Sequence, residues 1–137
     1  AGDPGNATLS VDDIAFGVLS CGKYAGTRLL AQRRTWLQDV RHVVVSVDEV
    51  PPNASHLGLE LVVQQPPQGS QELLAQGSGA LRALTLAQTL YARFPKAKWY
   101  VFVDDDTFVY MPTLLQEVLS KRAAGKPHFV GWAYRAG

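Results

Sequence analysis

Residues 99–110 read WYVFVDDDTFVY, an apolar run that ends directly in three aspartates and turns apolar again at Phe108. The apolar run predicts a buried β-strand over residues 98–103, because aromatic and β-branched residues favour strands. Two unit charges about 4 Å apart repel each other by roughly 4 kcal/mol at an effective dielectric constant near 20. The three neighbouring carboxylates therefore need a compensating charge.

A divalent cation is the favoured source of that charge, ahead of protonation or an arginine. Carboxylate oxygens without nearby His or Cys suit Mg²⁺ or Mn²⁺ better than zinc. In an extended chain alternate side chains share a direction. Asp104 and Asp106 are therefore predicted to converge on the metal while Asp105 points elsewhere. The competing interpretation is a solvated turn whose aspartates cap a helix beginning near Pro112.

Strand and helix patterns alternate along the whole chain. Apolar runs predict strands at residues 14–20, 42–47, 59–63, 98–103 and 128–132. Helical spacing predicts helices from Thr27 as N-cap, over residues 79–94, and from Pro112 to Gly125. This alternation predicts an α/β fold, a largely parallel sheet with helices on both faces. The 137 residues are expected to form one domain, with residues 1–12 as a disordered or extended lead-in.

The helical patterns also predict which side chains are buried. In the first helix Leu29, Leu30, Trp36 and Leu37 are expected in the core, with Arg28, Gln32, Arg33 and Arg34 facing solvent or a ligand. In the second helix the predicted apolar stripe is Leu81, Leu84, Ala87, Leu90, Tyr91 and Phe94. Trp99 is also expected in the core, and Arg82 is interpreted as an ordinary surface arginine.

Ligands of open parallel sheets bind beyond the carboxyl ends of the strands. That rule puts residues 20–23, 48–49 and 104–106 on one rim. Residues 17–24 match G-x-x-x-x-G-K but place Tyr24 where a phosphate-binding loop has Ser or Thr, and Gly17 falls inside a strand. A P-loop NTPase is therefore a less favoured alternative.

Composition limits the class of partner. Lys and Arg number 13 and Asp and Glu 12, a net charge of +1, which argues against broad electrostatic binding of nucleic acid. Asn6 and Asn53 begin N-glycosylation triplets, which favours the secretory pathway. Cys21 is the sole cysteine, so no disulfide closes within the chain. No apolar run approaches the ~18 residues of a membrane span, so any membrane anchor is not present in this chain.

The motifs resemble those of the family 31 glycosyltransferases, which include fringe and the core 1 β1,3-galactosyltransferases. Residues 99–109 are similar to that family's W-F-x-x-x-D-D-D-T-Y-V block. R-x-x-x-x-x-x-T-W over residues 28–36 resembles its first helix, and VVVSVDE resembles its second strand. HFVGWAY resembles the strand that carries a glycine after the metal motif. The similarity extends over roughly residues 14–134.

The resemblance implies a GT-A (Rossmann-like) nucleotide-sugar-binding fold, here the donor-binding portion. It implies an inverting transferase that uses Mn²⁺ (or Mg²⁺) and a UDP-sugar, acts on a glycan or glycoprotein acceptor and resides in the Golgi lumen. It further implies that Asp106 binds the metal, that Asp105 and Arg28 contact the donor, and that Asp104 supports the ribose or the metal.

The catalytic base stays unidentified under this resemblance. In the family, the base and a metal-binding histidine follow the glycine strand, and His128 precedes that position. The sequence accordingly leaves open a noncatalytic nucleotide-sugar-binding module as the alternative to an enzyme.

Overall fold

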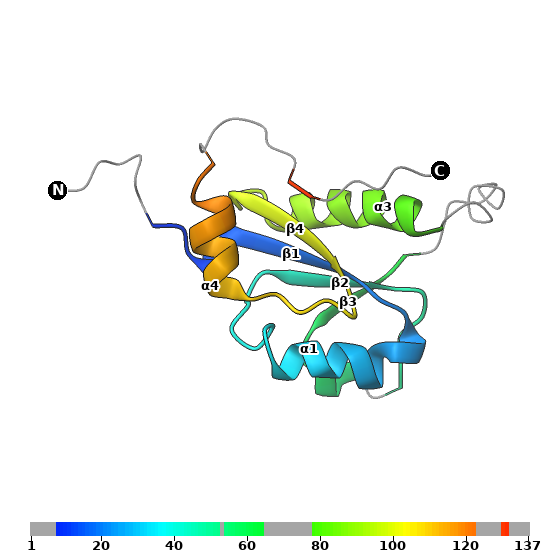
Figure 1. Ribbon diagram of the computed structural model, residues 1–137. Helices are drawn as coiled ribbons and strands as arrows, with labels where there is room; N and C mark the ends of the chain where they lie inside the picture. Colours follow the sequence, from blue (N-terminus) through cyan, green and yellow to red (C-terminus); the bar gives the residue numbers. More distant parts are fainter. Residues whose placement is uncertain (1–7, 53, 65–77, 123–129, 132–137) are drawn as a thin grey trace, which may run out of the picture.

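The computed structural model describes residues 8–52, 54–64, 78–122 and 130–131 (Figure 1). Asn6, Asn53 and Gly125 lie outside the described residues, as does most of the strand predicted at 128–132. In the part described, no helix is long and apolar enough to cross a membrane.

Four parallel strands form one sheet. They are β1 (Ile14–Leu19), β2 (Val43–Val47), β3 (Glu60–Val63) and β4 (Trp99–Asp104). Their order across the sheet is β3-β2-β1-β4, and every neighbouring pair is parallel. The α/β sheet expected from the alternating patterns is confirmed, with strand bounds within one residue of those predicted. β1 and β2 are the two central strands, and nearly all of their residues are buried because both faces of the sheet are covered there.

Helices cover both faces of this sheet (Figure 1). One face carries α1 (Leu30–Arg34) and α4 (Met111–Thr113), which continues as a π-helical turn, Leu114–Leu119 (η6). The other face carries α3 (Ser78–Arg93). Successive side chains of β1 point to opposite faces of the sheet, so Phe16 packs on the α1 and α4 side and Ala15 packs on the α3 side. Short 3-10 turns lie at Val11–Asp13, Gly22–Tyr24 and Ala54–Leu57, and a π-helical turn lies at Ala25–Leu29.

The first helical segment begins earlier than predicted. A 3-10 turn at Gly22–Tyr24 and a π-helical turn at Ala25–Leu29 precede α1. Thr27 is therefore not an N-cap, and its hydroxyl donates to the Tyr24 carbonyl oxygen at 3.3 Å. The N–H of Gly22 instead donates to Asp48 Oδ1 at 2.8 Å. The acceptor comes from the loop after β2, so a local capping rule misses it.

The buried face of α3 is rotated from the predicted stripe. Leu84 and Tyr91 are 60% and 63% exposed, whereas Leu86 and Leu90 are fully buried. Leu86 was not in the predicted set. Positions 82, 86 and 90 are four residues apart and share one side of a helix. Arg82 thus lies in line with the buried leucines and is half-buried, so its interpretation as an ordinary surface residue is wrong.

β4 is less buried than its composition predicts. It lies at an edge of the described sheet, and its residues are half-buried or exposed, with Phe102 41% exposed. Trp99 is half-buried against the core on the α4 side. Pro112 stands in the first turn of α4, as predicted. The predicted apolar stripe of that helix packs on the same core: Leu114, Leu115, Val118 and Leu119.

Candidate functional site

Strand register brings the chemically active residues to one rim. Leu19 of β1 pairs with Ser46 of β2 and with Asp104 of β4. The next residues along two of these strands are Ser20 and Asp105, and the Asp105 N–H donates to the Leu19 carbonyl oxygen at 3.1 Å. Ser20 and the aspartates are therefore neighbours at the carboxyl edge, where parallel sheets bind ligands.

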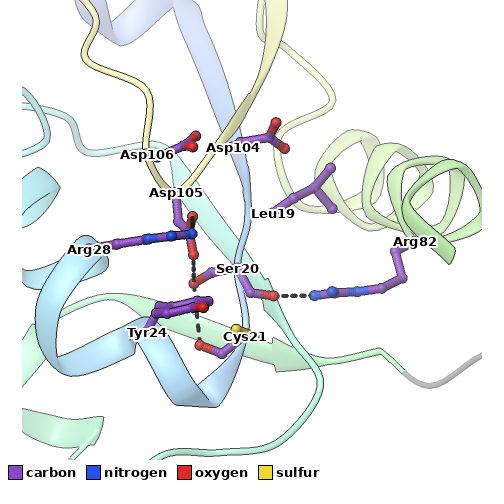
Figure 2. A pocket seen from close by; sticks show the side chains of 9 residues that line it. All are labelled: Leu19, Ser20, Cys21, Tyr24, Arg28, Arg82, Asp104, Asp105 and Asp106. Carbon is purple, nitrogen blue, oxygen red and sulfur yellow. Dashed lines mark hydrogen bonds and ion pairs between the residues drawn. The ribbon is translucent and has the colours of Figure 1, made fainter. Parts of the chain in front are cut away.

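The three aspartates occupy a turn rather than an extended strand. The Thr107 N–H donates to the Asp104 carbonyl oxygen at 3.2 Å, which closes a four-residue turn that we call the aspartate turn, residues 104–107. Asp104 and Asp106 are exposed, whereas Asp105 is 7% exposed. Figure 2 shows the carboxylates of Asp104 and Asp106 on the same side of the turn and that of Asp105 directed away from them. The separation predicted from strand alternation occurs, but the turn produces it.

Asp105 connects two other elements to the turn. Its carboxylate accepts a hydrogen bond from Ser20 Oγ at 2.8 Å and forms an ion pair with Arg28 Nη1 at 3.3 Å. The guanidinium of Arg28 also stacks on the Tyr24 ring, with its central carbon 3.8 Å from the ring centroid. Arg28 is thereby held in one orientation while 43% of its side chain stays exposed. The Arg28 guanidinium is therefore still available to a ligand in the pocket.

Arg82 approaches the same rim from α3, opposite Arg28 (Figure 2). Its Nη2 donates to the carbonyl oxygens of Ser20 and of Ser46, the latter at 3.0 Å. Its Nε is buried without a hydrogen-bond partner in the described residues. The sequence signal that could have identified Arg82 is its i,i+4 spacing from Leu86.

These side chains line a pocket of about 320 Å³, at the small end of the range for ligand sites. Its lining is Leu19, Ser20, Cys21, Tyr24, Arg28, Arg82, Asp104, Asp105 and Asp106. All four residues predicted to bind donor or metal are present. Lys23 and Glu49, which the strand-end rule also put on the rim, do not line it.

The pocket supplies some of the oxygen ligands that a hard divalent cation needs. The Asp104 and Asp106 side chains have no hydrogen-bond or ion-pair partner in the described residues, so their oxygens are free to bind a metal. Across that same part of the chain, no three His, Cys, Asp or Glu residues gather as a complete ligand set. Two carboxylates suffice for Mg²⁺-like binding when waters and phosphate oxygens supply the rest.

Two alternatives from the sequence fit this geometry poorly. Of the solvated-turn interpretation, the turn and the exposure of Asp104 and Asp106 are observed, but the capping is not, because the N-cap of α4 is Tyr110 and no side chain caps that helix. Gly17 lies inside β1, where an added Cβ would stand 2.9 Å from Phe102 Cδ1 and 3.0 Å from Leu86 Cδ2. Its glycine therefore permits close packing of β1 against its neighbours and does not form a phosphate-binding loop.

Comparison with known proteins gives the family. Searches of the curated proteins and of the solved structures each returned no significant match. The family model described as Fringe-like matches residues 9–134, nearly the whole chain. That range includes every strand and helix described above. With its parallel α/β sheet and its aspartate-lined rim, the chain belongs to the Fringe-like family, a group of family 31 glycosyltransferases with the GT-A fold.

Proposed function

We propose that this glycosyltransferase domain binds a UDP-sugar through Mn²⁺ (or Mg²⁺) at Asp104 and Asp106. The observation that carries the proposal is this pair of exposed carboxylates, which share one side of a turn and have no partner in the described residues. Repulsion between such neighbours favours a bound cation. The metal is therefore proposed to be held by Asp106 together with Asp104.

Arg28 is the proposed donor-contacting cation. Asp105 and Tyr24 hold its guanidinium at the pocket, and a preorganised guanidinium suits phosphate recognition. Asp105 acts mainly through Arg28 here, because its two carboxylate oxygens already accept from Ser20 and Arg28. Its proposed contact with the donor thus runs by way of the arginine or through a remaining lone pair.

The charge distribution suits transfer from a nucleoside diphosphate. Departure of the diphosphate builds negative charge on its oxygens, and a bound divalent cation supplies electrostatic stabilisation of that charge. The residues of this chain orient the phosphates: Arg28 from the α1 side and Arg82 from α3 flank the pocket. The sugar is proposed to pass with inversion to a hydroxyl of a glycan or glycoprotein, in the Golgi lumen of the secretory pathway.

The test is calorimetric titration with UDP in Mn²⁺ and in EDTA. We expect Mn²⁺ to strengthen UDP binding, and Asp106→Asn to remove that gain because one anionic metal ligand is lost. Asp39→Asn is the matched control, since Asp39 is exposed and outside the pocket. Equal UDP affinity in Mn²⁺ and EDTA for the unmodified chain would refute the metal assignment.

A noncatalytic nucleotide-sugar-binding module is the second candidate. One observation favours it: apart from the three aspartates assigned above to the metal and to Arg28, no carboxylate or histidine, the commonest general bases, lines the pocket in the described residues. Release of UDP from a UDP-hexose in the presence of an acceptor separates the two candidates. Metal-dependent binding without such release would favour the module.

A further inference from the structure

Two side chains of the first helical segment contact the backbone of the aspartate turn. Gln32 Nε2 donates to the Asp104 carbonyl oxygen at 3.0 Å and to the Thr107 carbonyl oxygen at 2.8 Å. Trp36 Nε1 donates to the same Thr107 oxygen at 3.0 Å. One amide group thus joins the first and last residues of the turn that carries the two exposed carboxylates.

Gln32 is 4% exposed, contrary to the expectation that it faces solvent or a ligand. Its Oε1 is buried without a hydrogen-bond partner in the described residues. The orientation of the amide follows from its partners, because two carbonyl oxygens require the NH₂ group. An unpaired buried oxygen lowers stability. Packing alone does not account for a glutamine at this position, whereas the bridge to the turn does.

The bridge is not needed to satisfy either carbonyl group. The Asp104 oxygen also accepts from the Thr107 N–H, and the Thr107 oxygen also accepts from Trp36. Removing the Gln32 amide therefore leaves both carbonyl oxygens with a donor. What it removes is the second link between the ends of the turn, which joins the two carbonyl groups and adds to the Thr107 N–H hydrogen bond that closes the turn.

We infer that Gln32, supported by Trp36, is a positioning residue that holds Asp104 and Asp106 at the separation needed to bind the cation. The inference rests on the proposed function, because it concerns the same metal. Removing a residue that orients a metal ligand without contacting the metal typically weakens metal binding by about 10–100-fold. Neither residue touches the pocket itself.

The discriminating variant is Gln32→Met, which keeps the length of the side chain and removes its polar atoms. We expect Mn²⁺ affinity in the presence of UDP to fall about tenfold. The urea midpoint should stay unchanged or rise, because the unpaired Oε1 is lost while both carbonyl oxygens keep a donor. A residue with a merely structural role would instead lower the midpoint and leave the affinity of the folded fraction unchanged.

Gln38→Met is the matched control, because Gln38 is an exposed glutamine of the same segment. Trp36→Phe keeps an aromatic ring that can pack against Phe16 but removes the Nε1–H donor together with part of the buried indole volume. We expect it to weaken Mn²⁺ binding less than Gln32→Met, since Gln32 still joins the turn. The double variant should lose more than the sum of the two, because it leaves the Thr107 oxygen without a side-chain donor.

Amide hydrogen exchange at Thr107 tests the bridge without metal. The Thr107 N–H closes the turn, so Gln32→Met should speed its exchange several-fold, with the amides of β1 unaffected. Unchanged Thr107 exchange together with unchanged Mn²⁺ affinity overturns the inference. If the unmodified chain shows no metal-dependent UDP binding, the proposed metal site fails first. Faster Thr107 exchange would then show a structural bridge, and the positioning role would be overturned.

Discussion

Single side chains at the rim have roles that their neighbours in space determine. Asp48 was expected at the rim after the second strand, and there it accepts the N–H of Gly22, at the start of the helical segment. This hydrogen bond is the main cause of its lowered pKa, assisted by its own backbone, that of Glu49 and the charge of Arg82. Burial opposes the lowering of this pKa, and after the Gly22 hydrogen bond it is the largest single effect.

Asp48→Asn tests this contact through its pH dependence. The pKa of Asp48 is lower in the folded chain than its ordinary value of about 3.8. Its charge therefore stabilises the fold above that value, and the benefit is lost as the pH falls through the lower folded pKa. We expect the variant to unfold at lower urea than the unmodified chain at pH 7, with a smaller difference at pH 3. A difference that stays constant over this range would contradict the assignment.

At the rim, the loop after β2 and the turn after β1 approach each other closely. The loop after β2 lies so near the 3-10 turn at Gly22–Tyr24 that a Cβ on Gly22 would stand 2.7 Å from Glu49 Cγ and 3.0 Å from the Glu49 carbonyl oxygen. Gly26, one turn later, has open space at the same atom. Two glycines four residues apart thus have different roles, one required by packing and one not.

Gly22→Ala and Gly26→Ala form a matched pair. Gly22→Ala forces the Glu49 loop to move and should destabilise the fold by about 1–3 kcal/mol. Gly26→Ala adds a methyl group to open space in a helical turn and should be neutral or stabilise by roughly 0.5–1 kcal/mol. Urea denaturation of both variants measures the difference. Equal effects would show that the approach of the loop does not constrain Gly22.

At the scale of the whole molecule, α3 seals the second face of the sheet. Leu86 and Leu90 are fully buried against Ala15 and Val44. The same line of α3 carries Arg82 to the rim, where it contacts the ends of β1 and β2. Packing of this helix therefore places a pocket residue as well as closing the core.

Leu86→Ala should cost about 2–5 kcal/mol of unfolding free energy, because it leaves a cavity between α3 and the sheet. Leu84→Ala is the control: Leu84 is 60% exposed and its loss should change stability by less than about 0.5 kcal/mol. Urea denaturation distinguishes the observed face of α3 from the predicted stripe, in which Leu84 was buried. A larger loss at Leu84 than at Leu86 would show that the helix is rotated the other way.

The sequence by itself determined the parallel sheet, the strand positions and the aspartates at a strand end, because apolar periodicity and local turn chemistry act between near neighbours in the chain. The family motifs also lie in that local pattern. Only the tertiary structure decided which partner each polar side chain finds. Asp105 pairs with Arg28, Asp48 caps Gly22, and Gln32 reaches a turn 72 residues away, contacts that no local pattern encodes.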